Sequence, residues 1–392
     1  MTLGYLCFVL LPALAGVVVL GSTMRGLLRL PLLRDVPCPE RERWPSLTII
    51  SPACNEEKHV QSAVASMLAL DYPDVSVVAV DDRSTDSTGA LLDALAKTHA
   101  RAHARLTVLH LTELPDGWLG KLNALEKGVA QSTGDWLLFM DADTHLSGQA
   151  LKRAISYADA QHVDCLSVVP QIATCGFVGD AVFDVSLALL SGNGRLRKVR
   201  DPKSRHVAAT GAFILVRRTA FAKTPGFSWL RLEVADDFGL ALMIKSHGGT
   251  CDIINGRGEV TLEWYSSFGE MTRLMQKNLF AIMAGFSLVR AIAVAALAAW
   301  MPLSLLALAL PVDRALHLIP LTGGACMTLA TVLAARATGR SILPALCWPI
   351  GFFGTAWMAL RSGIVGHRIG GIQWRGVVYP SGLLKAHQRV RM

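Results

Sequence analysis

The sequence predicts an α/β fold, with a mostly parallel sheet covered by helices on both faces, joined to transmembrane α-helices. Short β-branched runs alternate with helical patterns between residues 46 and 275, which is typical of a parallel sheet. Residues 1–24 contain no charged side chain, and residues 291–360 contain four. Only 17% of all residues are charged, whereas a soluble protein has about 25%. We therefore expect a water-soluble domain attached to segments that dissolve in lipid.

The first apolar segment, residues 5–24, has about the length that crosses a hydrocarbon core of ~30 Å. It lacks the basic start and the small-residue cleavage site of a signal peptide, so a retained anchor over residues 1–24 is expected. Arg25, Arg29 and Arg34 follow directly. Positive charge marks the cytoplasmic end of a span, so the soluble domain is expected in the cytoplasm, on a multi-pass protein of the cell (inner) membrane.

A C-terminal transmembrane region, residues 291–361, is expected to contain three apolar segments near 291–311, 317–335 and 342–360. Three complete spans would leave the basic tail, residues 362–392, outside the cell, against the charge rule. Prolines and glycines interrupt the third segment. Two alternatives therefore stay open: this segment is a re-entrant hairpin that returns the tail to the cytoplasm, or the number of spans is wrong.

The charge distribution points to the membrane as a partner. Acidic and basic residues balance through residue 290, so the whole net charge of +8 lies in the remainder of the chain. These basic residues flank apolar segments and match no nucleic-acid motif, so anionic headgroups are the expected partner and no nucleic acid is expected. The eight cysteines form no CxxC pair and no Cys/His cluster, which suits free thiols in a reducing compartment.

The soluble domain, residues 46–267, is expected to contain four buried strands in its first half. Helical patterns separate them, and Ser84 or Asp86 can cap the helix after the second strand. A later strand is expected at residues 214–216. The four strands are expected at residues 47–52, 75–80, 106–111 and 136–140.

Acidic side chains follow three of these strands at the point where each strand ends. Glu56 follows the first strand, Asp81 and Asp82 follow the second, and Asp141 and Asp143 follow the fourth. Ligands of parallel sheets bind beyond the carboxyl ends of the strands, so these acids are expected around one site. A single acid at such a position often only caps a helix or a turn, and we expect this local role for Asp81.

The glycine-rich loops that usually bind phosphates at such a sheet edge are absent. The chain contains no GxxxxGK[ST] motif, and no GxGxxG motif follows the first strand. A bound nucleotide would therefore be held by carboxylates and by a metal ion. The sequence Asp141-Ala142-Asp143 suits this role, because Mg²⁺ is commonly held by one or two carboxylates together with phosphate oxygens.

Five ordered segments resemble family 2 glycosyltransferases of the GT-A fold. The membrane segments and the GWLGK sequence are most similar to the bacterial branch that glycosylates lipids, which includes hopanoid-associated and carotenoid glycosyltransferases and ceramide glucosyltransferase. The five segments are SPACNEE (51–57), VVAVDDRSTDST (77–88), GWLGKLNAL (117–125), TGDWLLFMDADTHL (133–146) and EVADDFGLALMIKSHGG (233–249).

The resemblance implies how the donor would be held. Pro52, Ala53 and Glu56 would line the base and ribose of the nucleotide, and Asp82 would bind the base. Lys121 would approach the diphosphate as a point charge.

The resemblance also implies a metal site and a catalytic base. Asp141 would face the sugar or ribose, and Asp143, with Asp141, would hold Mg²⁺ or Mn²⁺ at the diphosphate. Asp236 and Asp237 occupy the position of the family's Glu-Asp pair. An inverting transfer needs one carboxylate that takes the proton of the acceptor hydroxyl. Asp237 is assigned this role, and Asp236 is the second candidate.

The family's (Q/R)xxRW motif is altered in this chain. It matches Arg273 to Lys277, where Gln276-Lys277 replaces the Arg-Trp pair. Processive synthases use that Trp to stack the acceptor sugar, so its loss disfavours a processive enzyme. Arg273 and Lys277 would lie on one helix face and would either steady the diphosphate or meet lipid headgroups. Residues 268–290 are expected as an interfacial helix.

The basic tail contains one further resemblance. Residues 373–379 resemble a WRGRxY element of the lipid-directed branch, with Val377 in place of Arg. The sequence alone assigns this element no role.

These features predict a membrane enzyme that moves one sugar from a nucleotide sugar, expected to be UDP-linked, to a hydroxyl of a membrane lipid with inversion. The alternative is a processive polysaccharide synthase of the same family. A third hypothesis is a membrane scaffold that binds a nucleotide sugar but has no catalytic activity.

Overall fold

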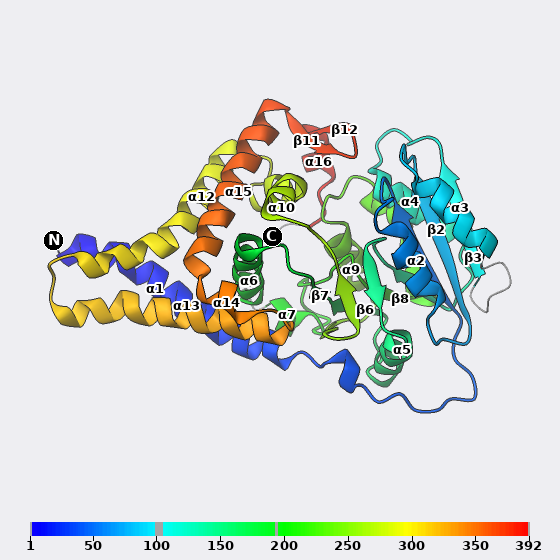
Figure 1. The fold of residues 1–392 in the computed structure, drawn as a ribbon, viewed down its shortest axis with the longest axis horizontal. Coiled ribbons are helices and arrows are strands. Elements are labelled where there is room, and N and C mark those ends of the chain that lie inside the picture. The colour runs from blue at the N-terminus through cyan, green and yellow to red at the C-terminus, as the bar shows by residue number, and fades with distance from the viewer. Residues whose placement is uncertain (1, 99–104, 193–194, 391–392) are drawn as a thin grey trace.

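The computed structural model describes residues 2–98, 105–192 and 195–390. A seven-stranded sheet has the order β3-β2-β1-β4-β8-β6-β9 (Figure 1). Neighbouring strands are parallel except β8, which runs antiparallel to β4 and β6. The mostly parallel sheet predicted from the sequence is confirmed. The strands are β1 (Leu47–Ala53), β2 (Val75–Asp82), β3 (Arg105–Leu111), β4 (Trp136–Phe139), β6 (Cys165–Val169), β8 (Ile214–Arg217) and β9 (Cys251–Asn255).

Helices cover both faces of this sheet. Successive residues of a strand point to opposite faces, and in β1 both Ile49 and Ile50 are fully buried. Ile49 belongs to a core with α2, α3 and α5, whereas Ile50 belongs to a core with α4 and α9. The central strands therefore have no polar face, as a sheet between two helical layers requires. These helices are α2 (Val60–Leu68), α3 (Thr88–Thr98), α4 (Gly120–Ala130), α5 (Ala150–Ala160) and α9 (Asp236–Ser246).

Smaller elements complete the domain. A three-stranded sheet has the order β5-β10-β7. Its strands are β5 (Thr144–Leu146), β7 (Gln171–Ile172) and β10 (Val260–Leu262). The remaining helices and helical turns here are η1 (Leu27–Arg29), η2 (Leu33–Asp35), α6 (Phe177–Gly192), α7 (Arg195–Lys198), α8 (Arg218–Phe221) and η3 (Gly226–Leu230).

Three helical segments in the described chain are long and apolar enough to cross a membrane. They are Leu3–Arg29, Leu288–Ala309 and Arg314–Ala337. The first covers α1 (Thr2–Arg25) from Leu3 on and η1. The second consists of α12 (Leu288–Leu303) and η5 (Ser304–Ala309), and the third of η6 (Arg314–His317) and α13 (Leu318–Ala337). The three helices project together from the side of the molecule away from the sheet (Figure 1). The N-terminal anchor and the first two C-terminal segments agree with the sequence prediction.

The third predicted segment, 342–360, is not a candidate span. It divides into α14 (Ile342–Leu346) and α15 (Trp348–Arg368), and α15 packs along α6 and α12. A Cβ on Gly351 would lie within 2.3 Å of the Ala181 carbonyl oxygen, so the glycine lets α15 and α6 approach closely. The glycines that suggested a break in the sequence are contact points between helices.

The C-terminal tail folds onto the soluble domain. It forms the hairpin β11 (Gly371–Trp374) and β12 (Val377–Pro380), followed by α16 (Ser381–His387). Ile372, Tyr379 and Leu384 are buried in the same core as Ile50. The tail and the soluble domain therefore share one core, although α12 and α13 separate them in the sequence. Among the described residues, two of the three apolar C-terminal segments are candidate spans, which favours the alternative that the number of spans is smaller than three.

The predicted single helix over residues 268–290 is wrong. The chain forms α10 (Phe268–Leu274), α11 (Gln276–Asn278) and the π-helical turn η4 (Leu279–Met283). Gly285 and Phe286 then adopt φ values of 53° and 60°. An α-helix cannot continue through left-handed residues, so these two positions separate the short helices from α12.

Arg340 joins the apolar helices to the soluble domain. Its guanidinium pairs with Asp180 Oδ1 at 2.8 Å and with Asp184 Oδ1 at 3.0 Å, and it donates to the Ile172 carbonyl at 3.2 Å. The Arg340 side chain is 4% exposed and that of Asp184 is 0% exposed. Burying these charges is tolerable only because they are paired.

Replacing Arg340 should therefore destabilise the protein strongly. We expect Arg340→Gln to lower the free energy of unfolding by about 3–5 kcal/mol, because it leaves two buried carboxylates without a cation. Thermal unfolding of the full chain in detergent measures this effect. Arg336→Gln removes the same charge from a nearby exposed position and should leave the melting temperature unchanged. Equal melting temperatures for the two variants would contradict the role given to Arg340.

Candidate active site

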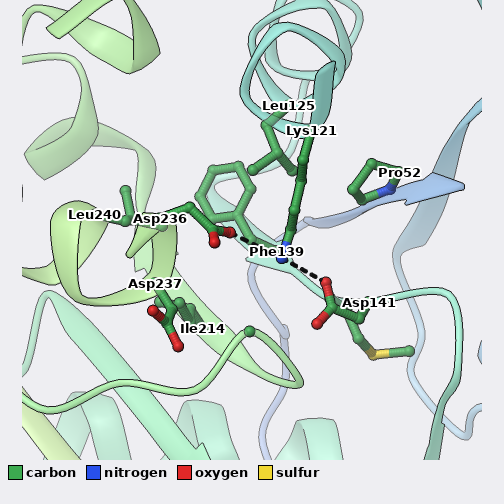
Figure 2. A pocket seen from close by; sticks show the side chains of 11 residues that line it. Pro52, Lys121, Leu125, Phe139, Asp141, Ile214, Asp236, Asp237 and Leu240 are labelled. Carbon is green, nitrogen blue, oxygen red and sulfur yellow. Dashed lines mark ion pairs between the residues drawn. The ribbon is translucent and has the colours of Figure 1, made fainter. Parts of the chain in front are cut away.

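A cleft lies where β1 and β4 end, between α4 and the start of α9 (Figure 2). Five of the residues predicted for the site line it, and they come from four separate segments of the chain. The lining residues are Pro52, Lys121, Leu125, Phe139, Met140, Asp141, Gly211, Ile214, Asp236, Asp237 and Leu240.

Lys121 lies between two carboxylates at the centre of this cleft. Its Nζ is 2.7 Å from Asp141 Oδ1 and 2.8 Å from Asp236 Oδ2, and Figure 2 shows the side chain reaching down between them. Burial disfavours its charged form, but Asp141 and Asp236 reverse this effect and hold the pKa of Lys121 above its usual value. Lys121 is therefore not a solvated surface lysine.

Backbone contacts position the two helices that border the cleft. The Leu119 amide donates to the Arg231 carbonyl at 2.7 Å, just before α4 begins at Gly120. On the other side, Glu233 Oε1 accepts from the Ala235 amide at 3.1 Å, one residue before α9 begins. Two acids in the first turn of α9 suit the positive end of the helix dipole.

Asp237 differs from its neighbour Asp236. Asp236 pairs with Lys121, whereas Asp237 accepts a hydrogen bond from the Phe238 amide at 2.8 Å and has no ion pair among the described residues. Burial and the charge of Asp236 raise the pKa of Asp237 to about 7. A carboxylate with this pKa can take a proton near neutral pH.

Asp143 has the properties of a metal ligand. Its Oδ1 is buried and has no hydrogen-bond partner. Burial, with the charges of Asp141 and Glu56, raises the pKa of Asp143 to about 8. No group of three or more His, Cys, Asp or Glu in the described chain could by itself hold a metal ion. The residues fit a cation that takes one or two carboxylates and completes its coordination with phosphate oxygens and water.

The other predicted donor residues lie beside the cleft. Ala53 is buried at the end of β1, and Asp82 is 2% exposed and bound by the Arg83 guanidinium at 2.8 Å and 3.0 Å. Asp81 accepts from the Ser84 amide at 3.2 Å, which is the local turn contact expected for it. Glu56 is engaged by Arg375 of the tail hairpin at 2.5 Å.

The two basic residues of the altered motif after β10 lie in different environments. Lys277 is half-buried, with its Nζ 3.0 Å from the centroid of the Trp374 ring. Arg273 is exposed on α10 and does not line the cleft. The two side chains expected on one helix face therefore differ in surroundings.

The tail hairpin has no role that could be assigned from the sequence alone. Trp374 and Arg375 contact Lys277 and Glu56, two residues that the sequence did predict for the site. The only available signal was the short resemblance over residues 373–379, which carries no information about contacts across the chain.

Comparison with known proteins agrees with this geometry. Residues 48–224 match the family model described as Glycosyl transferase family 2. A 4,4'-diaponeurosporenoate glycosyltransferase of Staphylococcus aureus is 26% identical over 344 residues, which are 85% of this chain and 88% of that relative. A beta-monoglucosyldiacylglycerol synthase of Synechocystis is 28% identical over 217 residues, 52% of this chain and 41% of the relative.

A polymer-forming relative and a solved structure also match. A poly-beta-1,6-N-acetyl-D-glucosamine synthase of Staphylococcus epidermidis is 27% identical over 111 residues, 28% of this chain and 25% of the relative. A mannosyltransferase of Pyrobaculum calidifontis, solved in complex with GDP-Man and Mn²⁺, has a TM-score of 0.54 at 18% identity and covers 93% of this chain and 97% of its own. This similarity shows that the two proteins share a fold.

The matched regions span a quarter and about two fifths of the lengths of two of these relatives. The soluble domain has the mostly parallel sheet, the acids at the strand ends and the family match together. Residues 48–224 of this chain therefore match glycosyl transferase family 2.

Proposed function

We propose that this protein transfers a single sugar from a nucleotide sugar to a hydroxyl group of a membrane lipid, with inversion at the anomeric carbon. The observation that carries the proposal is the meeting of Lys121, Asp141, Asp236 and Asp237 in one cleft of a domain that is continuous with apolar helices. The relative named for diaponeurosporenoate, which matches most of this chain, supports an acceptor of the lipid class. The donor is proposed to be UDP-linked.

Asp237 is the proposed general base. It takes the proton of the acceptor hydroxyl as that oxygen attacks the anomeric carbon, while the bond from the sugar to the diphosphate breaks. Lys121 neutralises Asp236 and leaves Asp237 as the acid with the raised pKa.

The donor is proposed to lie against the ends of β1, β2 and β4. Pro52, Ala53 and Glu56 would line the base and ribose, and Asp82 would bind the base. A divalent cation, Mg²⁺ or Mn²⁺, would be held by Asp143 and Asp141 and would neutralise charge on the departing nucleoside diphosphate. The buried, unpartnered Asp143 oxygen supports this site.

The protein is proposed to be a multi-pass protein of the cell membrane with its catalytic domain in the cytoplasm. Arg25, Arg29 and Arg34 support this orientation, because basic residues favour the cytoplasmic end of a span. The basic tail lies with the catalytic domain, so both positively charged regions fall on the same side.

A processive polysaccharide synthase is the second candidate, and the polymer-forming relative favours it. That match covers only 28% of this chain. The position of the family's acceptor-stacking Trp is held here by Lys277, which supports transfer of one sugar.

Lipid extracts test the proposed function. Membranes containing the protein should form a lipid that carries one hexose or N-acetylhexosamine when nucleotide sugars are supplied, as detected by mass spectrometry. Asp237→Asn should lower the rate by about 10²–10⁴-fold, because the proton acceptor is lost. Asp74→Asn, at an exposed position outside the cleft, is the matched control. A product that lengthens under excess donor would favour the polymerase, and full activity of Asp237→Asn would remove the assigned base.

The pH dependence of transfer should follow Asp237. Only its ionised form accepts a proton, and burial with Asp236 raises its pKa to about 7. We therefore expect kcat/KM to rise with pH up to about 7 and to level off above it. Steady-state rates measured on both sides of neutrality check this expectation. A rate that is already constant well below pH 7 would show that another group takes the proton.

Removal of divalent metal should abolish transfer. A chelator should stop the reaction, and Mg²⁺ or Mn²⁺ should restore it. Asp143→Asn should weaken Mn²⁺ binding by about tenfold or more, as measured by electron paramagnetic resonance of free Mn²⁺. Its melting temperature should not fall, because the amide carries no buried charge. Undiminished transfer after complete chelation would rule out the metal.

A further inference from the structure

The tail hairpin ends in a tight turn with an unusual residue at its tip. β11 and β12 are joined by Arg375 and Gly376 alone, with φ values of 49° and 80°. Two-residue turns with positive φ at both positions prefer Asn, Asp or Gly at the first position. Arginine is disfavoured in this conformation. Strained residues are often found at functional sites, so the side chain of Arg375 is expected to have a role.

Three side chains of the hairpin reach three different motifs of the donor site. The Arg375 guanidinium donates to the Cys54 carbonyl oxygen and pairs with Glu56, in the segment after β1. The Trp374 ring lies against Lys277 of the altered (Q/R)xxRW motif. Tyr379 is buried in the same core as Leu119 of the GWLGK sequence.

The segment that follows α16 is also held against the soluble domain. The amides of Arg389 and Val390 donate to Glu233 Oε2 at 2.6 Å and 3.0 Å. The other oxygen of Glu233 holds the Ala235 amide, directly before Asp236. The tail therefore has one defined position relative to the catalytic acids.

Three basic side chains from separate elements come together beside the hairpin. Lys121 comes from α4, Lys277 from α11 and Arg375 from the hairpin, and burial with the charges of Lys121 and Arg375 lowers the pKa of Lys277 to about 7. Lys121 and Arg375 each have carboxylate partners. Lys277 has no carboxylate within ion-pair distance among the described residues, and its cation–π contact with Trp374 holds it in place. An anion bound beside Lys277 would favour its charged form and would relieve the repulsion among the three basic side chains.

We propose that the β11–β12 hairpin forms one wall of the donor site, where Arg375 and Lys277 bind the diphosphate of the nucleotide sugar and Trp374 positions Lys277. A guanidinium has five N–H donors, so Arg375 can keep Glu56 and still reach a phosphate oxygen. The hairpin thus supplies the aromatic ring and the arginine that Gln276-Lys277 lacks, from a part of the chain about 100 residues away. The proposal rests on the proposed function, because it needs a nucleoside diphosphate in the cleft.

Binding of nucleotides to the full chain in lipid nanodiscs tests the proposal. Calorimetry would compare UDP with uridine and GDP with guanosine, in the presence of Mg²⁺. For the diphosphate that binds the wild-type protein more tightly, we expect Arg375→Gln and Lys277→Met each to lower the affinity about tenfold or more, because a hydrogen bond between charged groups is lost. The affinity for the matching nucleoside should not change.

Matched variants separate this role from general effects. Arg368→Gln and Lys385→Met remove the same charges from exposed positions near the hairpin and should keep wild-type affinity. Trp374→Phe retains a ring under Lys277 and should bind nearly as the wild type does, whereas Trp374→Leu should resemble Lys277→Met. Trp374→Leu should add little further loss to Lys277→Met, because a positioning residue acts through its partner.

Wild-type diphosphate affinity in the Arg375 and Lys277 variants would overturn the proposal, and so would an equal loss of nucleoside and diphosphate binding. The outcome for the proposed function is separate. If the wild-type protein transfers sugar while these variants bind UDP or GDP unchanged, only the hairpin assignment fails. If diphosphate binding depends on Arg375 and Lys277 but no sugar reaches a lipid, the hairpin assignment stands and the proposed function fails.

Discussion

The ion pairs of Lys121 with Asp141 and Asp236 are the contacts on which the site depends. The lysine belongs to α4, one acid follows β4, and the other acid begins α9. A buried ammonium is stable only when its carboxylate partners are in place. The three elements must therefore adopt one relative position, which also fixes the neighbouring Asp143 and Asp237.

The same contacts set the electrostatic character of the cleft. Four carboxylates, Asp141, Asp143, Asp236 and Asp237, surround one lysine, and burial raises the pKa of the two that Lys121 does not bind. The cleft is thus short of positive charge on the side of Asp143. The tail brings Arg375 to Glu56 and Trp374 to Lys277. Acidic side chains of the strand ends and basic side chains of the tail region and α11 therefore meet around one cleft.

Several features could be predicted from the sequence because they are local. The β-branched runs around Ile49 and Val77 identify buried strands, and acids at strand ends share one edge of a parallel sheet. The sequence left the third C-terminal segment open, because a glycine in an apolar segment can either interrupt a helix or let two helices approach closely. At Gly351 it makes room for α6 and leaves the helix unbroken. The contact of Arg375 with Glu56 joins residues 319 positions apart, and no local pattern carries that information.

That long separation has a consequence for the order in which the protein is made. The catalytic sheet is synthesised first, but Ile372, Tyr379 and Leu384 of its core emerge only after α12 and α13. Domains fold largely as their chain becomes available, and exposed apolar surface persists until the missing part arrives. The catalytic core is therefore completed only once the membrane helices have been synthesised. A chain truncated before the hairpin would retain the acids of the cleft with an open, unfinished core, so completion of this core depends on residues that follow the apolar helices.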